Sequence, residues 1–158
     1  MNERYSPSRR ALVLGLVVLA GSGRVTLAEP LPEVAVTKDP SCGCCEAWVE
    51  HLRKDGFKVK VTDAAVNPLK VRLGVPRELA SCHTAQVGGY VVEGHVPAMA
   101  IRRLLAERPS GTGLAVPGMP VGSPGMEVDG VEPATYDVIL FGPAGQSTFA
   151  RFRGSQAI

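Results

Sequence analysis

The segment from residue 34 to residue 61 constrains the fold most, because strand and helix patterns follow one another there within about thirty residues. Val34 and Val36 alternate with small or polar residues, which indicates a short strand ending at Lys38. Apolar residues then recur at the spacing of one helix face, at Cys45, Trp48, Val49 and Leu52. From Phe57 to Val61, apolar residues alternate with lysines and indicate a second strand. The pattern predicts a βαβ unit with two parallel strands.

The boundaries of this helix also have sequence signals. Ser41 is the expected N-cap residue, and Gly56 stands where a helix commonly ends. A second, shorter helix is expected to begin at Asn67-Pro68 and to end by Gly74.

The second half of the chain predicts a hairpin, a helix, a loop and another hairpin. Residues 84–87 and 90–93 flank Gly88-Gly89, a strong hairpin signal, and a helix is expected between Pro97 and Pro109. Gly111 to Gly130 is rich in glycine and proline without periodicity, which predicts an ordered loop or a lid. Residues 136–141 and 147–152 predict the last hairpin, and the polar C-terminal residues are expected to fray.

This order of elements predicts an α/β protein with a thioredoxin-like mixed sheet. The order is βαβ, helix, β-hairpin, helix, followed by an added Gly/Pro/Met loop and a C-terminal β-hairpin. In such a layout the third strand lies beside the first strand and antiparallel to it. Cys82, at the start of the third strand, is therefore expected to meet Cys42, Cys44 and Cys45, which follow the first strand.

The first residues have the pattern of an export signal. Arg4, Arg9 and Arg10 precede an apolar run at residues 11–20, and small residues follow at residues 26–28. We expect residues 1–28 to be a cleaved signal peptide and residues 29–158 to form a single metal-binding domain. The apolar run is about half of the ~20 residues that a membrane-spanning helix needs, so we expect no stable membrane insertion after cleavage. The predicted location is the periplasm, reached by the Sec route or, given Ser8-Arg9-Arg10, by the twin-arginine route.

The charge of the exported part excludes one class of partner. The full chain of 158 residues has 17 basic and 15 acidic residues. Without residues 1–28, which hold four arginines and one glutamate, 13 basic and 14 acidic residues remain, a net charge of −1. A protein without a dense basic stripe is not expected to bind nucleic acid.

The four cysteines, Cys42, Cys44, Cys45 and Cys82, are the candidate functional residues. A helix N-terminus favours thiolate over thiol, and thiolates bind metals or attack disulfides. Three sulfurs in one helical turn do not surround a single ion comfortably, but they can bridge several. Cu(I) prefers soft sulfur and tolerates low coordination numbers, so a thiolate-bridged copper cluster fits this spacing. Zinc fits less well, because zinc sites usually draw ligands from two spaced pairs.

Two other interpretations of the cysteines stay open. They can be structural disulfides, for instance Cys42–Cys45 with Cys44–Cys82, because an exported protein meets an oxidising environment. They can also make the chain a thiol–disulfide oxidoreductase that uses Cys42 and Cys45 as its catalytic pair. Enzymes of the thioredoxin type favour a cis-proline opposite that pair, and Cys82-His83-Thr84 stands there instead.

Four segments resemble a known family. These segments are residues 39–45, 81–84, 88–97 and 118–126. They are similar to the bacterial domain-of-unknown-function family 411, which is itself similar to the copper-resistance protein CopG. The resemblance implies a thioredoxin-like fold, a periplasmic location and a copper cluster bound by Cys42, Cys44, Cys45 and Cys82. It also implies a redox-active role in copper tolerance. We expect copper ions and other periplasmic copper-handling proteins as partners.

Four more residues are candidate accessory metal ligands. Pro117-Gly118-Met119 and Pro124-Gly125-Met126 repeat within the long loop, and thioether sulfur is a soft ligand; the alternative is that both methionines fill gaps under the loop. His83 adjoins Cys82, and His95 precedes the helix at Pro97, where packing or capping is the competing role. His51 is expected to be solvated on the outer face of the first helix, and Trp48 to be in the core.

Overall fold

The computed structural model describes Met1 and residues 30–158, so the expected signal peptide lies outside the described residues. The described chain is a mixed α/β fold with three α-helices and one mixed sheet of eight strands, in the order β2-β1-β3-β4-β5-β6-β7-β8. No helix in this part of the chain is long and apolar enough to cross a membrane.

The first half has the predicted βαβ unit. Strand β1 (Val34–Lys38) leads into α1 (Gly43–Lys54), and β2 (Val59–Asp63) pairs parallel with β1. Helix α2 (Asn67–Arg72) follows, and then a short 3-10 helix, η1 (Arg77–Leu79). The expected N-cap at Ser41 is wrong. Cys42 occupies that position without a side-chain cap, while the Asp39 carboxylate accepts hydrogen bonds from the backbone N–H and hydroxyl of Ser41.

The second half contains the predicted hairpins and one additional strand. Strands β3 (His83–Val87) and β4 (Tyr90–Glu93) precede α3 (Ala98–Glu107). Strand β5 (Gly113–Ala115) lies within the stretch that was expected to be a loop. Strands β6 (Thr135–Gly142) and β7 (Gly145–Arg153) form the C-terminal hairpin, and β8 (Gln156–Ala157) pairs with β7 where fraying was expected.

Strand β5 joins the two halves into one sheet. It pairs parallel with β4 and antiparallel with β6. The approach is close, because a Cβ added at Gly113 would lie 1.9 Å from the Val91 carbonyl oxygen. Periodicity did not reveal β5 because it has only three residues and its pairing depends on a glycine with space for the neighbouring backbone.

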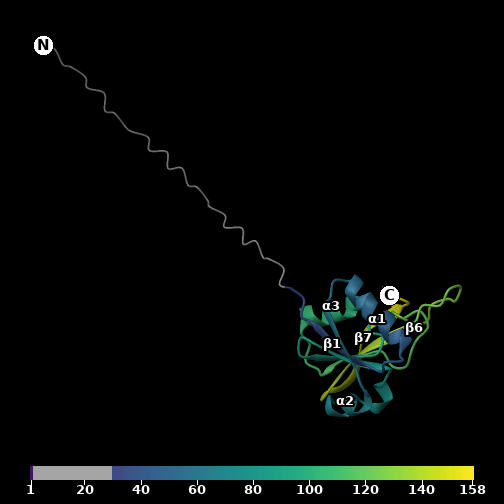
Figure 1. The fold of residues 1–158 in the computed structure, drawn as a ribbon. Coiled ribbons are helices and arrows are strands. Elements are labelled where there is room, and N and C mark those ends of the chain that lie inside the picture. Colours follow the sequence, from purple (N-terminus) through teal and green to yellow (C-terminus); the bar gives the residue numbers. More distant parts are fainter. Residues whose placement is uncertain (2–29) are drawn as a thin grey trace.

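The helices cover both faces of the sheet, as Figure 1 shows, with α2 on the side opposite α1 and α3. The larger core includes Trp48, Leu52, Ile101 and Leu104, which pack with Val36, Ala85 and Val92 of the sheet. A smaller cluster on the opposite face contains Val75, Leu79, Val91, Ala115 and Phe141. The apolar residues between 45 and 52 that were predicted to share one helix face therefore form the buried face of α1.

Replacing Gly113 should destabilise the whole sheet. We expect Gly113→Ala to lower the free energy of unfolding by about 1–3 kcal/mol or more, because the added methyl group forces β5 away from β4. Gly43→Ala is the matched control, since an added Cβ there meets nothing within 4 Å. Urea denaturation monitored by Trp48 fluorescence measures both variants. Equal midpoints would contradict the close packing of β4 and β5.

Candidate metal centre

The four cysteines meet at one place, as the predicted strand arrangement requires. Lys38, the last residue of β1, pairs with His83, the first residue of β3, in an antiparallel register. The residues just beyond these ends, Cys42 to Cys45 on one side and Cys82 on the other, are therefore neighbours. All four sulfur atoms lie within 4.8 Å of one another.

The sulfurs have different environments and bonding states. Cys42 and Cys45 form a disulfide, whereas Cys44 and Cys82 are free thiols. The Cys42 and Cys44 sulfur atoms are 3.6 Å apart. Cys45 is fully buried against the core, and the other three cysteines are partly exposed. The cluster therefore lies at the surface end of α1, with one sulfur anchored in the interior.

Cys82 is surrounded by sulfur and by imidazole. Its sulfur lies 3.2 Å from His83 Nδ1 and 3.1 Å from His95 Nε2, and both histidines are fully buried. Burial raises the pKa of the Cys82 thiol to about 11, and the neighbouring Cys44 adds to this increase. Without a metal, Cys82 is consequently protonated at neutral pH.

His95 is fixed in position by two contacts. Its Nδ1 donates to the Pro124 carbonyl oxygen at 2.8 Å, which leaves Nε2 directed at Cys82. The next residue, Val96, accepts a hydrogen bond from the Trp48 indole at 2.9 Å. Trp48 is thus a core residue, as predicted, and it also ties the backbone beside His95 to helix α1.

The glycine-rich loop lies over the cysteines. The Ser81 hydroxyl donates to the Gly118 carbonyl oxygen at 2.6 Å. A Cβ added at Gly125 would lie 2.7 Å from both the Cys44 carbonyl oxygen and the Trp48 backbone nitrogen, so this residue packs directly on α1. These contacts and the Pro124–His95 bond put the loop in the place expected of a lid. Met119 is 52% exposed and Met126 is half-buried, and their role as ligands stays a prediction.

A buried ion pair supports Cys82 from the other face of the sheet. Lys70 Nζ donates to Glu93 at 2.5 Å and to the Thr84 hydroxyl at 2.8 Å, and Glu93 is fully buried. Glu93 also accepts the backbone N–H of Ser81 at 2.7 Å, which fixes the chain next to Cys82. This pair was not predictable from the sequence, because Lys70 and Glu93 interact only through tertiary contact. The one sequence signal for it was Glu93, an acidic residue at the end of an apolar strand.

His51 does not have the solvated environment that was expected. Its Nε2 accepts the backbone N–H of Ala98, the first residue of α3, at 3.1 Å. The N–H groups of a first helical turn lack partners within the helix, so an acceptor from α1 is favourable there. His51 therefore joins the two helices and is not part of the metal centre.

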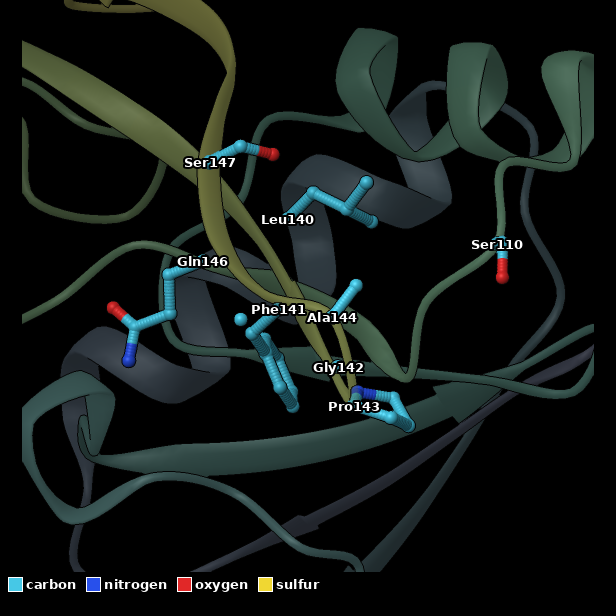
Figure 2. A pocket seen from close by; sticks show the side chains of 9 residues that line it. Ser110, Leu140, Phe141, Gly142, Pro143, Ala144, Gln146 and Ser147 are labelled. Carbon is cyan, nitrogen blue, oxygen red and sulfur yellow. The ribbon is translucent and has the colours of Figure 1, made fainter.

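A surface hollow of about 230 Å³ lies at the turn between β6 and β7 (Figure 2). The residues that line it are Ser110, Leu140, Phe141, Gly142, Pro143, Ala144, Gly145, Gln146 and Ser147. These residues provide no sulfur, imidazole or charged group. The hollow therefore does not compete with the cysteines as a site of chemistry.

Comparison with known proteins identifies similar chains. A family model described as "Protein of unknown function, DUF411" matches residues 79–126, which include Cys82, both buried histidines and most of the loop. A solved structure titled copper resistance protein CopG, form 1, is 46% identical with a TM-score of 0.72, and the match covers 80% of this chain and 100% of that one. Form 2 has the same identity and TM-score, over 78% and 99% of the two chains. No match is found among curated proteins.

The ion pair below Cys82 can be tested by removing its cation. We expect Lys70→Met to lower the free energy of unfolding by about 3 kcal/mol or more, because Glu93 is then left buried without a counter-charge. Lys70→Met combined with Glu93→Gln should cost less than the single change, because no charge remains buried. Arg53→Met, which removes an exposed ion pair with Glu50, is the surface control and should change stability by less than about 1 kcal/mol. A double variant whose free energy of unfolding in denaturant titrations is as low as that of Lys70→Met, or lower, would exclude this coupling.

Proposed function

This chain belongs to the DUF411 family and is similar to a copper resistance protein, and on this basis we propose that it binds Cu(I) in a cluster bridged by cysteines. Cys42, Cys44, Cys45 and Cys82 are the proposed ligands. The proposed role is copper resistance or copper handling, with copper ions as cargo and other periplasmic copper-handling proteins as partners.

The observation that carries this proposal is the convergence of four sulfurs within 4.8 Å. Sulfur donors this close together can share ions, and thiolate is the donor that Cu(I) prefers. Two of the sulfurs form a disulfide, so they become ligands only after a two-electron reduction that yields two thiols. Copper binding by all four cysteines therefore requires the reduced protein.

Protons must leave the site when copper binds. A ligating cysteine is a thiolate, and burial holds the Cys82 pKa at about 11, well above neutral pH. Copper consequently competes with a proton for this sulfur, and the apparent affinity should rise with pH up to that pKa.

Two further parts of the proposal concern fold class and location. The order β1-α1-β2-α2-β3-β4-α3, with β3 antiparallel to β1, supports a thioredoxin-like arrangement to which β5 through β8 are added. The pattern of residues 1–28 and the Cys42–Cys45 disulfide support an exported, periplasmic protein.

A thiol–disulfide oxidoreductase is the second candidate, and the Cys42–Cys45 disulfide at the start of α1 is the observation that favours it. The free Cys44 thiol beside this disulfide argues against it, because it would intercept a mixed disulfide with a substrate. Reduction of insulin by the metal-free protein separates the two functions. Turnover that disappears in Cys42→Ser and Cys45→Ser variants would support the enzyme.

Serine substitutions test the copper cluster. We expect each of Cys42→Ser, Cys44→Ser, Cys45→Ser and Cys82→Ser to lower the amount of Cu(I) bound per reduced chain by at least about one ion, because a hydroxyl group is a poor ligand for soft copper. Anaerobic titration followed by elemental analysis measures this. Met99→Leu, which removes an exposed sulfur on α3, should bind as much copper as the unmodified chain. Undiminished copper in Cys82→Ser would remove the four-cysteine model.

A further inference from the structure

Cys82 belongs to a second group of potential ligands, one that does not include the other cysteines. Its sulfur, His83 Nδ1 and His95 Nε2 all lie within 4.8 Å of one another. The three side chains come from the start of β3 and from the segment that follows β4, two places held together by the β3–β4 pairing. The position of the three side chains is thus set by the sheet and not by the first turn of α1, which contains the disulfide.

The hydrogen bond to Pro124 prepares His95 as a ligand. A carbonyl oxygen only accepts, so the proton of the neutral ring is on Nδ1, and the lone pair on Nε2 faces the Cys82 sulfur at 3.1 Å. Imidazoles that bind metals usually donate their other ring N–H to a carbonyl or carboxylate in this way. His95 therefore has the tautomer and the ring orientation of a metal ligand before any metal is present.

His83 has a buried nitrogen that its role as a packing residue leaves unexplained. The ring is fully buried between Trp48, at a centroid distance of 4.3 Å, and His95, at 5.1 Å. Its Nε2 has no hydrogen-bond partner within the described chain. An orphaned buried group has an energetic cost, and packing alone does not account for it at this position. With the proton on Nε2, the Nδ1 lone pair also faces the Cys82 sulfur, at 3.2 Å.

We propose that Cys82, His83 and His95 form a second metal site that binds a divalent transition-metal ion. Two imidazoles and one thiolate make a ligand set of borderline softness, which suits Cu²⁺ better than an all-sulfur set does and also binds Zn²⁺. In the setting of the proposed function the ion is Cu²⁺. The site needs only Cys82 among the cysteines, so it is complete when Cys42 and Cys45 are joined by a disulfide.

The two sites share one sulfur, and this gives the second site a distinct role. The disulfide removes two ligands from the four-cysteine cluster but none from the cysteine–histidine site. The oxidised protein consequently keeps a place for a divalent ion, while the reduced protein adds the soft cluster. No electron transfer between the two sites is part of this inference.

The test uses the oxidised Cys44→Ser protein, in which Cys82 is the only free thiol and the disulfide is intact. Co²⁺ is the probe, because it has the ligand preferences of a divalent ion, has visible absorption and does not oxidise thiols. We expect one Co²⁺ per chain, with an intense near-ultraviolet band from charge transfer between thiolate and metal, and displacement of Co²⁺ by Cu²⁺.

Three additional variants identify the ligands. Adding Cys82→Ser to Cys44→Ser should abolish the charge-transfer band. His83→Ala and His95→Ala should each raise the Co²⁺ dissociation constant by at least about tenfold. His51→Gln alters the remaining histidine of the described chain and should leave both the band and the affinity unchanged. Circular dichroism and the unfolding midpoint establish that each variant is folded.

The inference is wrong if the folded Cys44→Ser protein shows no thiolate-to-Co²⁺ band at millimolar metal, or if both alanine variants bind Co²⁺ like their parent. If an alanine variant fails to fold, His95→Gln and His83→Gln replace it and have the same expected tenfold loss. Failure here is distinguishable from failure of the proposed function, since Cu(I) binding by the reduced chain is measured separately and depends on Cys42 and Cys45.

Discussion

The antiparallel pairing of β1 with β3 is the constraint on which the metal centre depends. It puts Lys38 opposite His83, so that the chain leaving β1 and the chain approaching β3 meet at the same end of the sheet. Cys42, Cys44 and Cys45 are on the first of these segments and Cys82 is on the second. No cysteine needs a special backbone conformation to reach the others, because ordinary sheet register brings them within 4.8 Å.

The buried ion pair and the loop hold Cys82 from opposite sides. Below the sheet, Glu93 accepts the Ser81 backbone N–H while Lys70 neutralises its charge. Above it, the Ser81 hydroxyl and His95 bind the carbonyl oxygens of Gly118 and Pro124. With Ser81 and His95 held in this way, the backbone beside the Cys82 thiol loses little freedom when a metal binds, and preorganisation of this kind favours affinity. The loop thus acts through its backbone, which is why its methionine pattern alone did not show how it contacts the site.

The sequence predicted those parts of the site that depend on local pattern and strand order. Alternation and helical spacing placed β1, α1 and β3 well enough to bring Cys82 to the other cysteines, and the structure confirms that meeting. Strand β5 was not predictable from periodicity, because its pairing requires Gly113 to fit against the Val91 carbonyl group, a contact with no local signature. His51 and the Lys70–Glu93 pair escaped prediction for a related reason. A charged or polar residue on a predicted helix is expected to be solvated unless its buried partner is known.

Cys82 belongs both to the group of four cysteines and to the group with His83 and His95. The burial of its thiol affects the chemistry of both groups. As a thiol with a pKa of about 11 it is a weak nucleophile at neutral pH, which disfavours disulfide exchange at this position. The same sulfur becomes a thiolate when a metal replaces its proton, because a coordinating ion stabilises the negative charge that burial destabilises. This combination protects the thiol from oxidation by disulfide exchange while leaving its sulfur able to lose the proton to a metal. The Cys42–Cys45 disulfide forms without Cys82, and the Cys82 thiol stays free in that oxidised state.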